Sequence, residues 1–223
     1  MNPAGKELLR VYTRLRKVYG PQRWWPAKTR FEVIIGAILT QNTAWSNVEK
    51  AIKKLKDSGL LSHEAIRNAR PGTLERAIKS AGYFNVKAGR IKNFVRFLYD
   101  AYGGSLSRMA GGNTADLRTA LLSVNGIGPE TCDSILLYAF KRPVFVVDAY
   151  TKRIFARYGL FREGVSYGEV QSFFMDNLPK SERLYNEYHA LIVRHAKEHC
   201  RTRPRCRACH LRADNCLEKR IMK

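Results

Sequence analysis

The spacing of apolar positions predicts α-helices along almost the whole chain. Residues 5–20 carry an apolar stripe at helical spacing that stops at Gly20, a typical helix end. Residues 30–39 are apolar on nearly every side, as in a helix buried at the centre of a domain. Further amphipathic segments occupy residues 47–59, 73–82, 86–104, 114–124, 167–179 and 182–200.

One run has the composition of a β-strand, residues 143–147 (PVFVV), and it is too short and solitary to build a sheet. No internal repeat or low-complexity segment interrupts the helical pattern. The sequence therefore predicts an all-α fold.

The charge of the chain indicates its partner. The 223 residues include 40 Lys and Arg against 19 Asp and Glu, a net charge of +21 that is spread from Lys6 to Lys223. A cationic folded surface favours nucleic acid over the two alternatives, an anionic membrane surface or an adaptation unrelated to any partner. The sequence has no apolar stretch long enough to span a membrane and no signal-peptide pattern. We therefore expect a cytoplasmic, nucleoid-associated protein.

A tight turn separates two apolar-periodic segments in residues 121–135, LLSVNGIGPETCDSI. Gly126 and Gly128 allow positive φ and close approach of another molecule, and Pro129 suits the first turn of the next helix. A helix that begins after such a turn presents N–H groups and a positive dipole end to a phosphate. The turn is therefore either a clamp for the DNA backbone or an ordinary connection between helices.

Residues 121–159 resemble the helix–hairpin–helix and Gly/Pro-loop-Asp signature of the endonuclease III superfamily of DNA glycosylases. Hairpin, aspartate and a C-terminal cysteine cluster occur here in that family's order. The resemblance implies two helical domains with DNA bound between them. A six-helix barrel would span residues 28–138, with the hairpin at about 114–140, and residues 1–27 plus 139–223 would form the second domain. It also implies that Gln41, Gly126, Ile127, Gly128 and Thr131 bind double-stranded DNA that contains a damaged base.

Four cysteines crowd the C-terminal end of the sequence: Cys200, Cys206, Cys209 and Cys216. Their number and spacing favour a metal site over disulfides, and both zinc and a [4Fe–4S] cluster accept four thiolates. The resemblance implies a [4Fe–4S] cluster in a loop over residues 200–216. Five, two and six residues separate the ligands here, where the family pattern is six, two and five.

Asp148 lies twenty residues after Gly128, where the family keeps its catalytic aspartate. It could simply cap the helix that follows it. A fixed carboxylate could also stabilise the positive charge that builds on the sugar as an N-glycosidic bond breaks, or activate water.

Glu130 occupies the hairpin position at which family members that also cut the DNA backbone carry a lysine. A carboxylate cannot form the Schiff base that this second reaction requires. The sequence therefore resembles a monofunctional glycosylase, with Lys141 and Lys152 the nearby amines that could act in its place. Whether Glu130 has a catalytic role or only favours the helix start is open.

The three tryptophans of the chain all lie within residues 24–45. Together with Gln41, which the resemblance implies fills the gap left in the duplex, they make this segment similar to the bacterial 3-methyladenine DNA glycosylases of type III. The similarity implies a base pocket, and the residues expected to line it are Trp24, Trp25, Trp45, Phe84 and Lys197. Packing in a core is the alternative for the aromatic residues, and we expect structural roles for His189 and His195.

These observations predict a monomeric base-excision enzyme that flips out and hydrolyses an alkylated purine such as 3-methyladenine or 7-methylguanine. The first alternative is a glycosylase of endonuclease III type with lyase activity on abasic sites, or a mismatch uracil or thymine glycosylase. The second is a DNA-binding helical module without catalysis, against which Asp148 argues.

Overall fold

A computed structural model describes residues 2–22, 24–25, 27–212 and 216. The chain divides into two compact units, residues 1–24 with 143–223, and residues 25–142. We call them the terminal unit and the central unit. From the sequence we expect boundaries after residues 27 and 138. In the structure the central unit also includes residues 25–27 and 139–142.

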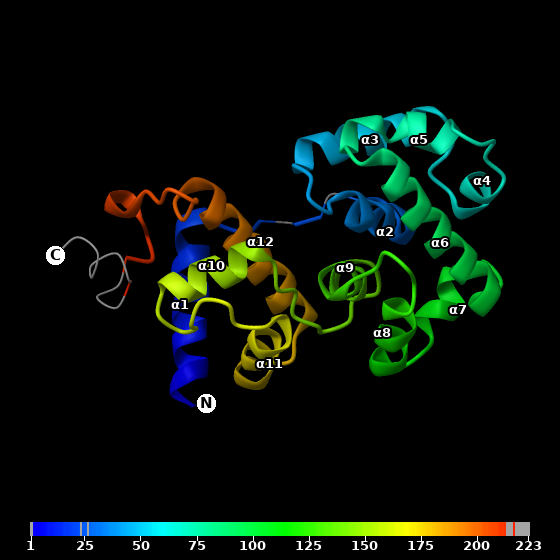
Figure 1. Cartoon of the computed structure of the whole chain (residues 1–223). Helices are drawn as coiled ribbons and strands as arrows, with labels where there is room; N and C mark the ends of the chain where they lie inside the picture. Colours follow the sequence, from blue (N-terminus) through cyan, green and yellow to red (C-terminus); the bar gives the residue numbers. More distant parts are fainter. Residues whose placement is uncertain (1, 23, 26, 213–215, 217–223) are drawn as a thin grey trace. The chain divides into compact units, whose positions relative to one another are not determined.

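The central unit carries most of the helices (Figure 1). They are α2 (Arg30–Leu39), α3 (Trp45–Asp57), α4 (His63–Arg67), α5 (Thr73–Ala77), the 3-10 turn η1 (Lys79–Ala81), α6 (Phe84–Tyr102), α7 (Leu106–Ala110), α8 (Thr114–Leu122), α9 (Pro129–Ser134) and the π-helical turn η2 (Ile135–Ala139).

Helix α2 forms the core of this unit. It begins at Thr29, whose hydroxyl accepts a hydrogen bond from the Glu32 amide at 3.1 Å, and every residue from Phe31 to Leu39 is buried. Helices α3, α6 and α9 and the turn η2 pack around it (Figure 1). A helix enclosed on all sides explains why residues 30–39 show no polar face in the sequence.

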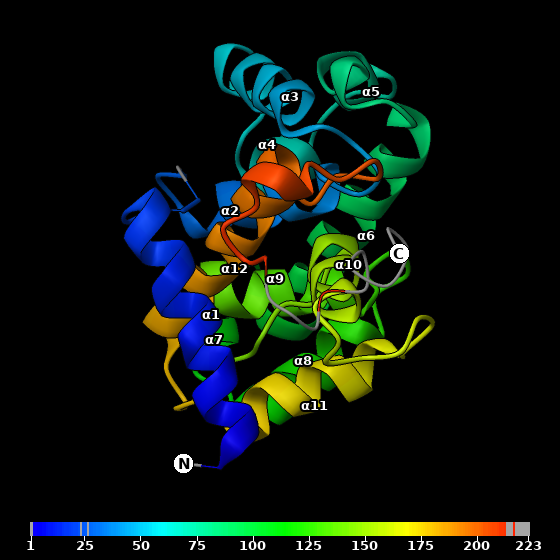
Figure 2. The same ribbon diagram turned by 90° about the vertical axis from the view of Figure 1, so that its left-hand side faces the viewer.

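The terminal unit joins the two ends of the chain. Its helices are α1 (Pro3–Tyr19), α10 (Ala149–Arg157), α11 (Tyr167–Asn177) and α12 (Glu182–Glu198), followed by the 3-10 turn η3 (Cys206–Ala208). Helix α1 packs against both α11 and α12 (Figure 2), and α10 packs against α12.

Aromatic rings fill the core of the terminal unit. The rings of Phe145 and Phe174 stack with centroids 4.1 Å apart, and Phe155 meets Phe174 edge to face at 4.9 Å. Tyr188 of α12 closes the cluster and donates its hydroxyl to the carbonyl of Leu8 at 2.8 Å, which ties α12 to α1. Burial of such rings is a large hydrophobic contribution, and the buried hydroxyl has its partner.

Residues 143–147 run extended and mostly buried without pairing to another strand, and the described part of the chain contains no β-strand. Side chains satisfy the backbone instead, because Gln171 donates to the carbonyl of Phe145 at 2.7 Å. The all-α fold predicted from the sequence is confirmed. No helix among the described residues combines the length and the apolar character needed to cross a membrane.

Candidate DNA-binding and catalytic site

Helices α8 and α9 form the predicted hairpin, joined by residues 123–128. Gly126 has φ of +94°, and a Cβ placed there would overlap the side chain of Arg90, with its Cδ only 2.9 Å away. The turn therefore requires glycine at this position. Gly128 is different: its φ is −88° and its ψ is 178°, an extended conformation that any residue adopts. Of the two glycines that allow positive φ, only Gly126 uses it, since the chain has already turned there.

Open space surrounds Gly128, with no atom within 4 Å of a Cβ built on it. Gly128 is also the N-cap of α9, which has Pro129 in its first turn and no side-chain cap. A residue without a side chain at the start of a helix leaves room for a large ligand to approach the backbone. This geometry is compatible with a contact to a DNA phosphate.

An ion pair joins the two helices of the hairpin. The guanidinium of Arg118 on α8 donates from Nε and Nη2 to the two carboxylate oxygens of Asp133 on α9, at 2.8 and 3.1 Å. The Asp133 side chain is fully buried. Burial also raises the pKa of the neighbouring Cys132 thiol to about 12, so this cysteine stays protonated and packs as a core residue.

Gln41 contacts the hairpin directly. Its side-chain amide donates to the carbonyl of Gly126 at 3.0 Å and to the hydroxyl of Thr131 at 2.8 Å. Its carbonyl oxygen accepts a hydrogen bond from Arg90. Three residues expected to bind DNA therefore lie together in the central unit, and Gln41 must release these bonds before it could enter a duplex.

Lys87 of α6 anchors the loop that carries Gln41. The residue is 2 % exposed, and its ammonium group donates to the carbonyls of Leu39 and Ala81 at 2.8 and 2.7 Å and to the hydroxyl of Thr43 at 2.5 Å. Burial, and then the charge of Arg90, lower the pKa of Lys87. All three ammonium hydrogens have acceptors, so this lysine fixes both ends of the turn after α2.

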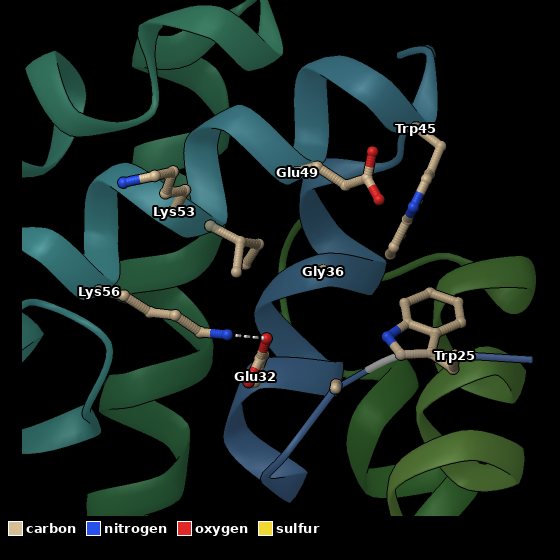
Figure 3. A pocket seen from close by; sticks show the side chains of 9 residues that line it. Trp25, Glu32, Gly36, Trp45, Glu49, Lys53 and Lys56 are labelled. Atoms are coloured by element: carbon tan, nitrogen blue, oxygen red, sulfur yellow. Dashed lines mark hydrogen bonds and ion pairs between the residues drawn. The ribbon is translucent and has the colours of Figure 1, made fainter.

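A pocket of about 220 Å³ opens in the central unit between α2 and α3. Figure 3 shows Trp25 and Trp45 toward one side of it and the pair Glu32–Lys56 toward the other. The indoles of Trp25 and Trp45 meet edge to face at 5.2 Å, and Trp25 stacks on Tyr138 of η2 at 4.8 Å. Gly36 permits this arrangement, because a Cβ there would lie 3.2 Å from the Trp25 ring.

Carboxylates also line this pocket. Glu32, 7 % exposed, pairs with the ammonium of Lys56 at 2.6 Å and accepts a hydrogen bond from the Lys28 amide at 3.1 Å. Glu49 lies four residues after Trp45 on α3, about one helical turn away, and its side chain is next to Trp45 in the pocket lining (Figure 3). The pocket thus combines aromatic faces with two carboxylates and with the two ammonium groups of Lys53 and Lys56, so its charges balance and its distinctive feature is the pair of indoles.

The structure distributes the other expected pocket residues differently. Trp25 and Trp45 line the pocket, whereas Phe84, the first residue of α6, is half-buried and is not among its lining residues. Trp24 and Lys197 belong to the terminal unit, and Lys197 is exposed near the end of α12.

Asp148 is the N-cap of α10 in the terminal unit. Its Oδ1 accepts hydrogen bonds from the amide and the hydroxyl of Thr151, at 2.7 and 2.8 Å, and its Oδ2 lies 3.5 Å from Nε2 of His189. Burial would raise the pKa of Asp148, but the hydrogen bond and charge of His189 and the two bonds from Thr151 outweigh it and lower this pKa. The carboxylate is therefore held ionised.

Glu130 is exposed in the first turn of α9. Of the two lysines considered in its place, Lys152 donates its ammonium to the carbonyl of Val165 at 2.9 Å, and Lys141 lies exposed after η2 with φ of +55°. The two lysines belong to different units.

The cysteine loop follows α12, and its four thiols form no disulfide. Cys209 lies 3.5 Å from Nε2 of the buried His195, and Arg157 donates to Cys200 at 3.6 Å. Burial raises the pKa of the Cys209 thiol, against the lowering effect of a hydrogen bond from the Leu211 backbone. Four soft thiol donors fit iron or zinc, although the described residues do not form a group of three or more side chains placed to hold a metal ion.

Sequence reasoning missed Tyr138 and the two carboxylates of the pocket. Tyr138 sits inside the apolar run of residues 135–140, where nothing distinguishes it from a core residue. Glu32 is the one acidic residue in the buried segment 30–39, and an ionisable group inside such a segment was the available signal. His189 was assigned a structural role, and its contact with Asp148 depends on the packing of α10 on α12.

Two helical units, a hairpin closed by a glycine turn and a strongly basic chain define the class of helix–hairpin–helix DNA repair proteins. The model of the HhH-GPD superfamily of base excision DNA repair proteins matches residues 35–180. The chain belongs to this superfamily and is a DNA glycosylase of base excision repair. The family resemblance inferred from the sequence is confirmed.

Similar proteins agree with this assignment. A protein of Methanocaldococcus jannaschii described as a candidate DNA repair glycosylase is 49 % identical over 95 % of this chain and 96 % of its own. Endonuclease III of Sulfolobus acidocaldarius is 32 % identical over 83 % of this chain and 82 % of its own.

Solved structures share the fold. The H. pylori 3-methyladenine DNA glycosylase MagIII, bound to 1,N6-ethenoadenine, has a TM-score of 0.75 and 27 % identity over 87 % of this chain and 97 % of its own. A non-covalent complex of endonuclease III with DNA has a TM-score of 0.82 at 24 % identity, over 98 % of this chain and 99 % of its own.

Proposed function

We propose that the chain is a monofunctional glycosylase that removes an alkylated purine, such as 3-methyladenine or 7-methylguanine, from double-stranded DNA by attack of water. The observation that carries this proposal is the pocket lined by Trp25, Trp45 and two carboxylates. Alkylation at N3 or N7 makes a purine cationic, weakens its glycosidic bond and leaves it flat, so it suits the electron-rich faces of the two indoles.

The energetic advantage is selective. An aromatic face attracts a cation by roughly 0.5–2 kcal/mol beyond ordinary stacking. Tyr138 behind Trp25 and Gly36 beneath it hold the indole in place, so little freedom is lost when a base binds. The likeness to an enzyme that is itself named a 3-methyladenine DNA glycosylase supports the same substrate class.

Asp148 is the proposed catalytic residue. A positively charged base is a good leaving group, so the reaction needs little acid catalysis and depends on stabilising the cation that develops on the sugar. A carboxylate that its surroundings keep ionised provides this stabilisation. Water then adds to the sugar, and the DNA retains an abasic site in an intact strand.

The absence of an amine at position 130 supports the monofunctional assignment. Glu130 lies in the first turn of α9, where its negative charge also suits the helix dipole. A covalent imine requires a lysine, and the ammonium of Lys152 is engaged by a backbone carbonyl.

The test measures release of free base from duplexes that carry 7-methylguanine, 3-methyladenine, hypoxanthine, thymine glycol or a G·T mismatch. We expect release of the methylated purines without strand cleavage, and no enzyme–DNA adduct after borohydride reduction. Asp148→Asn should bind DNA normally and lose most turnover. Trp25→Ala should impair release of the cationic bases more than that of neutral hypoxanthine.

A glycosylase with lyase activity is the second candidate, favoured by the relative named endonuclease III that is 32 % identical to this chain. Its signature in the same assay would be release of thymine glycol and a borohydride-trapped adduct. Loss of that adduct in Lys141→Ala or Lys152→Ala would identify the amine. Release of thymine from the mismatch without trapping would instead favour a mismatch enzyme.

We also propose that Cys200, Cys206, Cys209 and Cys216 hold a [4Fe–4S] cluster, which would order the basic loop that they span. Anaerobically purified protein should contain about four iron and four sulfide per chain. Cys206→Ser should lose iron, whereas Cys132→Ala, at the buried cysteine outside the loop, should retain it. One zinc and no iron per chain would refute the cluster.

The chain is further proposed to act as a cytoplasmic monomer whose partner is damaged duplex DNA. Sedimentation of the free protein and of its complex with a single-lesion duplex should give one chain per duplex.

A further inference from the structure

The two oxygens of the Asp148 carboxylate have separate partners, and these assign the carboxylate one chemical role. Oδ1 is fully engaged, because Thr151 donates to it from both its amide and its hydroxyl, at 2.7 and 2.8 Å. Oδ2 lies 3.5 Å from Nε2 of His189, on a different helix. Thr151 belongs to the helix that Asp148 caps, so His189 is the partner that long-range packing provides.

His189 is in a fixed position. Its side chain is 8 % exposed, it lies on α12, and α12 packs directly on α10. The Asp148 side chain is 12 % exposed, so the pair sits at the edge of solvent. An imidazole and a carboxylate held by two packed helices keep their relative orientation with little loss of side-chain freedom.

The cationic side chains of α10 next to Asp148 have other partners. On α10 itself, Lys152 donates its ammonium to the carbonyl of Val165, and Arg153 donates to the carbonyl of Cys200. From α12, the hydrogen bond and the charge of His189 lower the pKa of Asp148 against the opposing effect of burial.

We propose that His189 is a positioning residue that holds Oδ2 of Asp148 and keeps this carboxylate ionised, so that Asp148 acts as a fixed negative charge and not as the acceptor of the water proton. The inference rests on the proposed catalytic role of Asp148 and deepens it. A carboxylate that accepts two hydrogen bonds from Thr151 and faces the imidazole of His189 at 3.5 Å is a weak base, whereas its charge still stabilises a cation on the sugar.

The first measurement needs no substrate. The carboxyl carbon of Asp148 is titrated by NMR in the full-length protein, for wild type, His189→Phe and His189→Gln. Phe removes the hydrogen-bond donor and should raise the pKa of Asp148 by about one unit or more. Gln retains an N–H donor without a charge and should fall between the two. His63→Phe, in the central unit, is the control and should leave this pKa unchanged.

The second measurement is the pH dependence of single-turnover base release. In His189→Phe the acid limb should move up by the same amount, so the rate loss should be about tenfold below that limb and small above it. A residue that only supports the fold would lower the rate equally at every pH. If the Phe variant does not fold, His189→Asn, too short to reach Oδ2, carries the same expectation.

The outcomes separate the two proposals. An unchanged Asp148 pKa in a folded His189→Phe variant, or a rate loss equal at all pH values, overturns the role of His189. Wild-type protein that releases no base from any of the substrates overturns the proposed function, while the NMR titration still decides whether His189 controls Asp148.

Discussion

The two hairpin glycines can be separated by one pair of substitutions, because they perform different tasks. Gly126→Ala introduces a side chain at φ of +94° and places its Cβ against the Arg90 side chain. The positive φ costs about 1–2 kcal/mol, and the displaced arginine adds about 1–3 kcal/mol. We expect the free energy of unfolding to fall by about 2–5 kcal/mol on these two grounds together.

Gly128→Ala is the matched variant. Its backbone is extended and the space around it is open, so the expected loss of unfolding free energy is below about 1 kcal/mol, the usual cost at an N-cap. Its new methyl group would meet a phosphate that approaches α9. We therefore expect weaker binding to every DNA sequence, damaged or not, from a protein that is as stable as wild type.

Urea unfolding followed by tryptophan fluorescence measures the stability of each variant, since Trp25 and Trp45 report on the central unit. Fluorescence anisotropy with undamaged duplex at several salt concentrations measures DNA binding. Equal stability loss in the two variants would refute the assignment of strain to Gly126. Unchanged DNA affinity in Gly128→Ala would refute the hairpin as a backbone contact.

Other predictions follow from single groups of contacts. Asp133→Ala should lower the free energy of unfolding by about 1–3 kcal/mol in urea titrations, because it removes a fully buried carboxylate that accepts two hydrogen bonds from Arg118. Lys87→Met should cost about 1–3 kcal/mol in the same assay, because the buried carbonyl of Leu39 loses the lysine donor while that of Ala81 keeps the Thr43 hydroxyl, and should weaken DNA binding through the Gln41 loop. The logarithm of the binding constant for undamaged duplex should fall steeply and linearly with the logarithm of the salt concentration. The pKa of Asp148 is lowered on folding, so its ionisation stabilises the protein above the ordinary carboxyl value of about 3.9 and that stabilisation is lost as pH falls through the folded value. The difference in unfolding free energy between wild type and Asp148→Asn should therefore shrink on acidification below about pH 4.

The helical fold and the hairpin could be predicted from the sequence because both depend on local patterns. Helical spacing of apolar residues marks α1, α6 and α12, and a Gly-x-Gly-Pro turn marks the break between α8 and α9. The pattern could not tell which of the two glycines takes the positive φ, because two glycines allow several turns.

The candidate site depended on contacts between distant residues, which no local pattern encodes. Gln41 could be recognised from its motif, but not its three hydrogen bonds to the hairpin and Arg90. The stacking of Tyr138 on Trp25 could not be predicted, because an aromatic residue in a buried apolar run is ordinarily part of the core. The pairing of Asp148 with His189 spans 41 positions (189 − 148) and exists because α10 packs on α12.

The backbone strain of the molecule indicates where binding has been favoured over stability. The non-glycine residues with positive φ in the described part of the chain are Trp25, Asn42, Tyr83 and Lys141, and all belong to the central unit. Such conformations cost about 1–3 kcal/mol each and persist only where surrounding contacts impose them. Contacts in the structure account for two of these positive φ angles. Trp25 turns its indole onto Gly36 and Tyr138, and Asn42 adjoins the glutamine that contacts the hairpin. Asp148, by contrast, is a regular N-cap on a regular helix. Under the proposed function, a strained segment of the central unit would recognise the base, whereas the chemistry would use a carboxylate that an ordinary helix start holds in place.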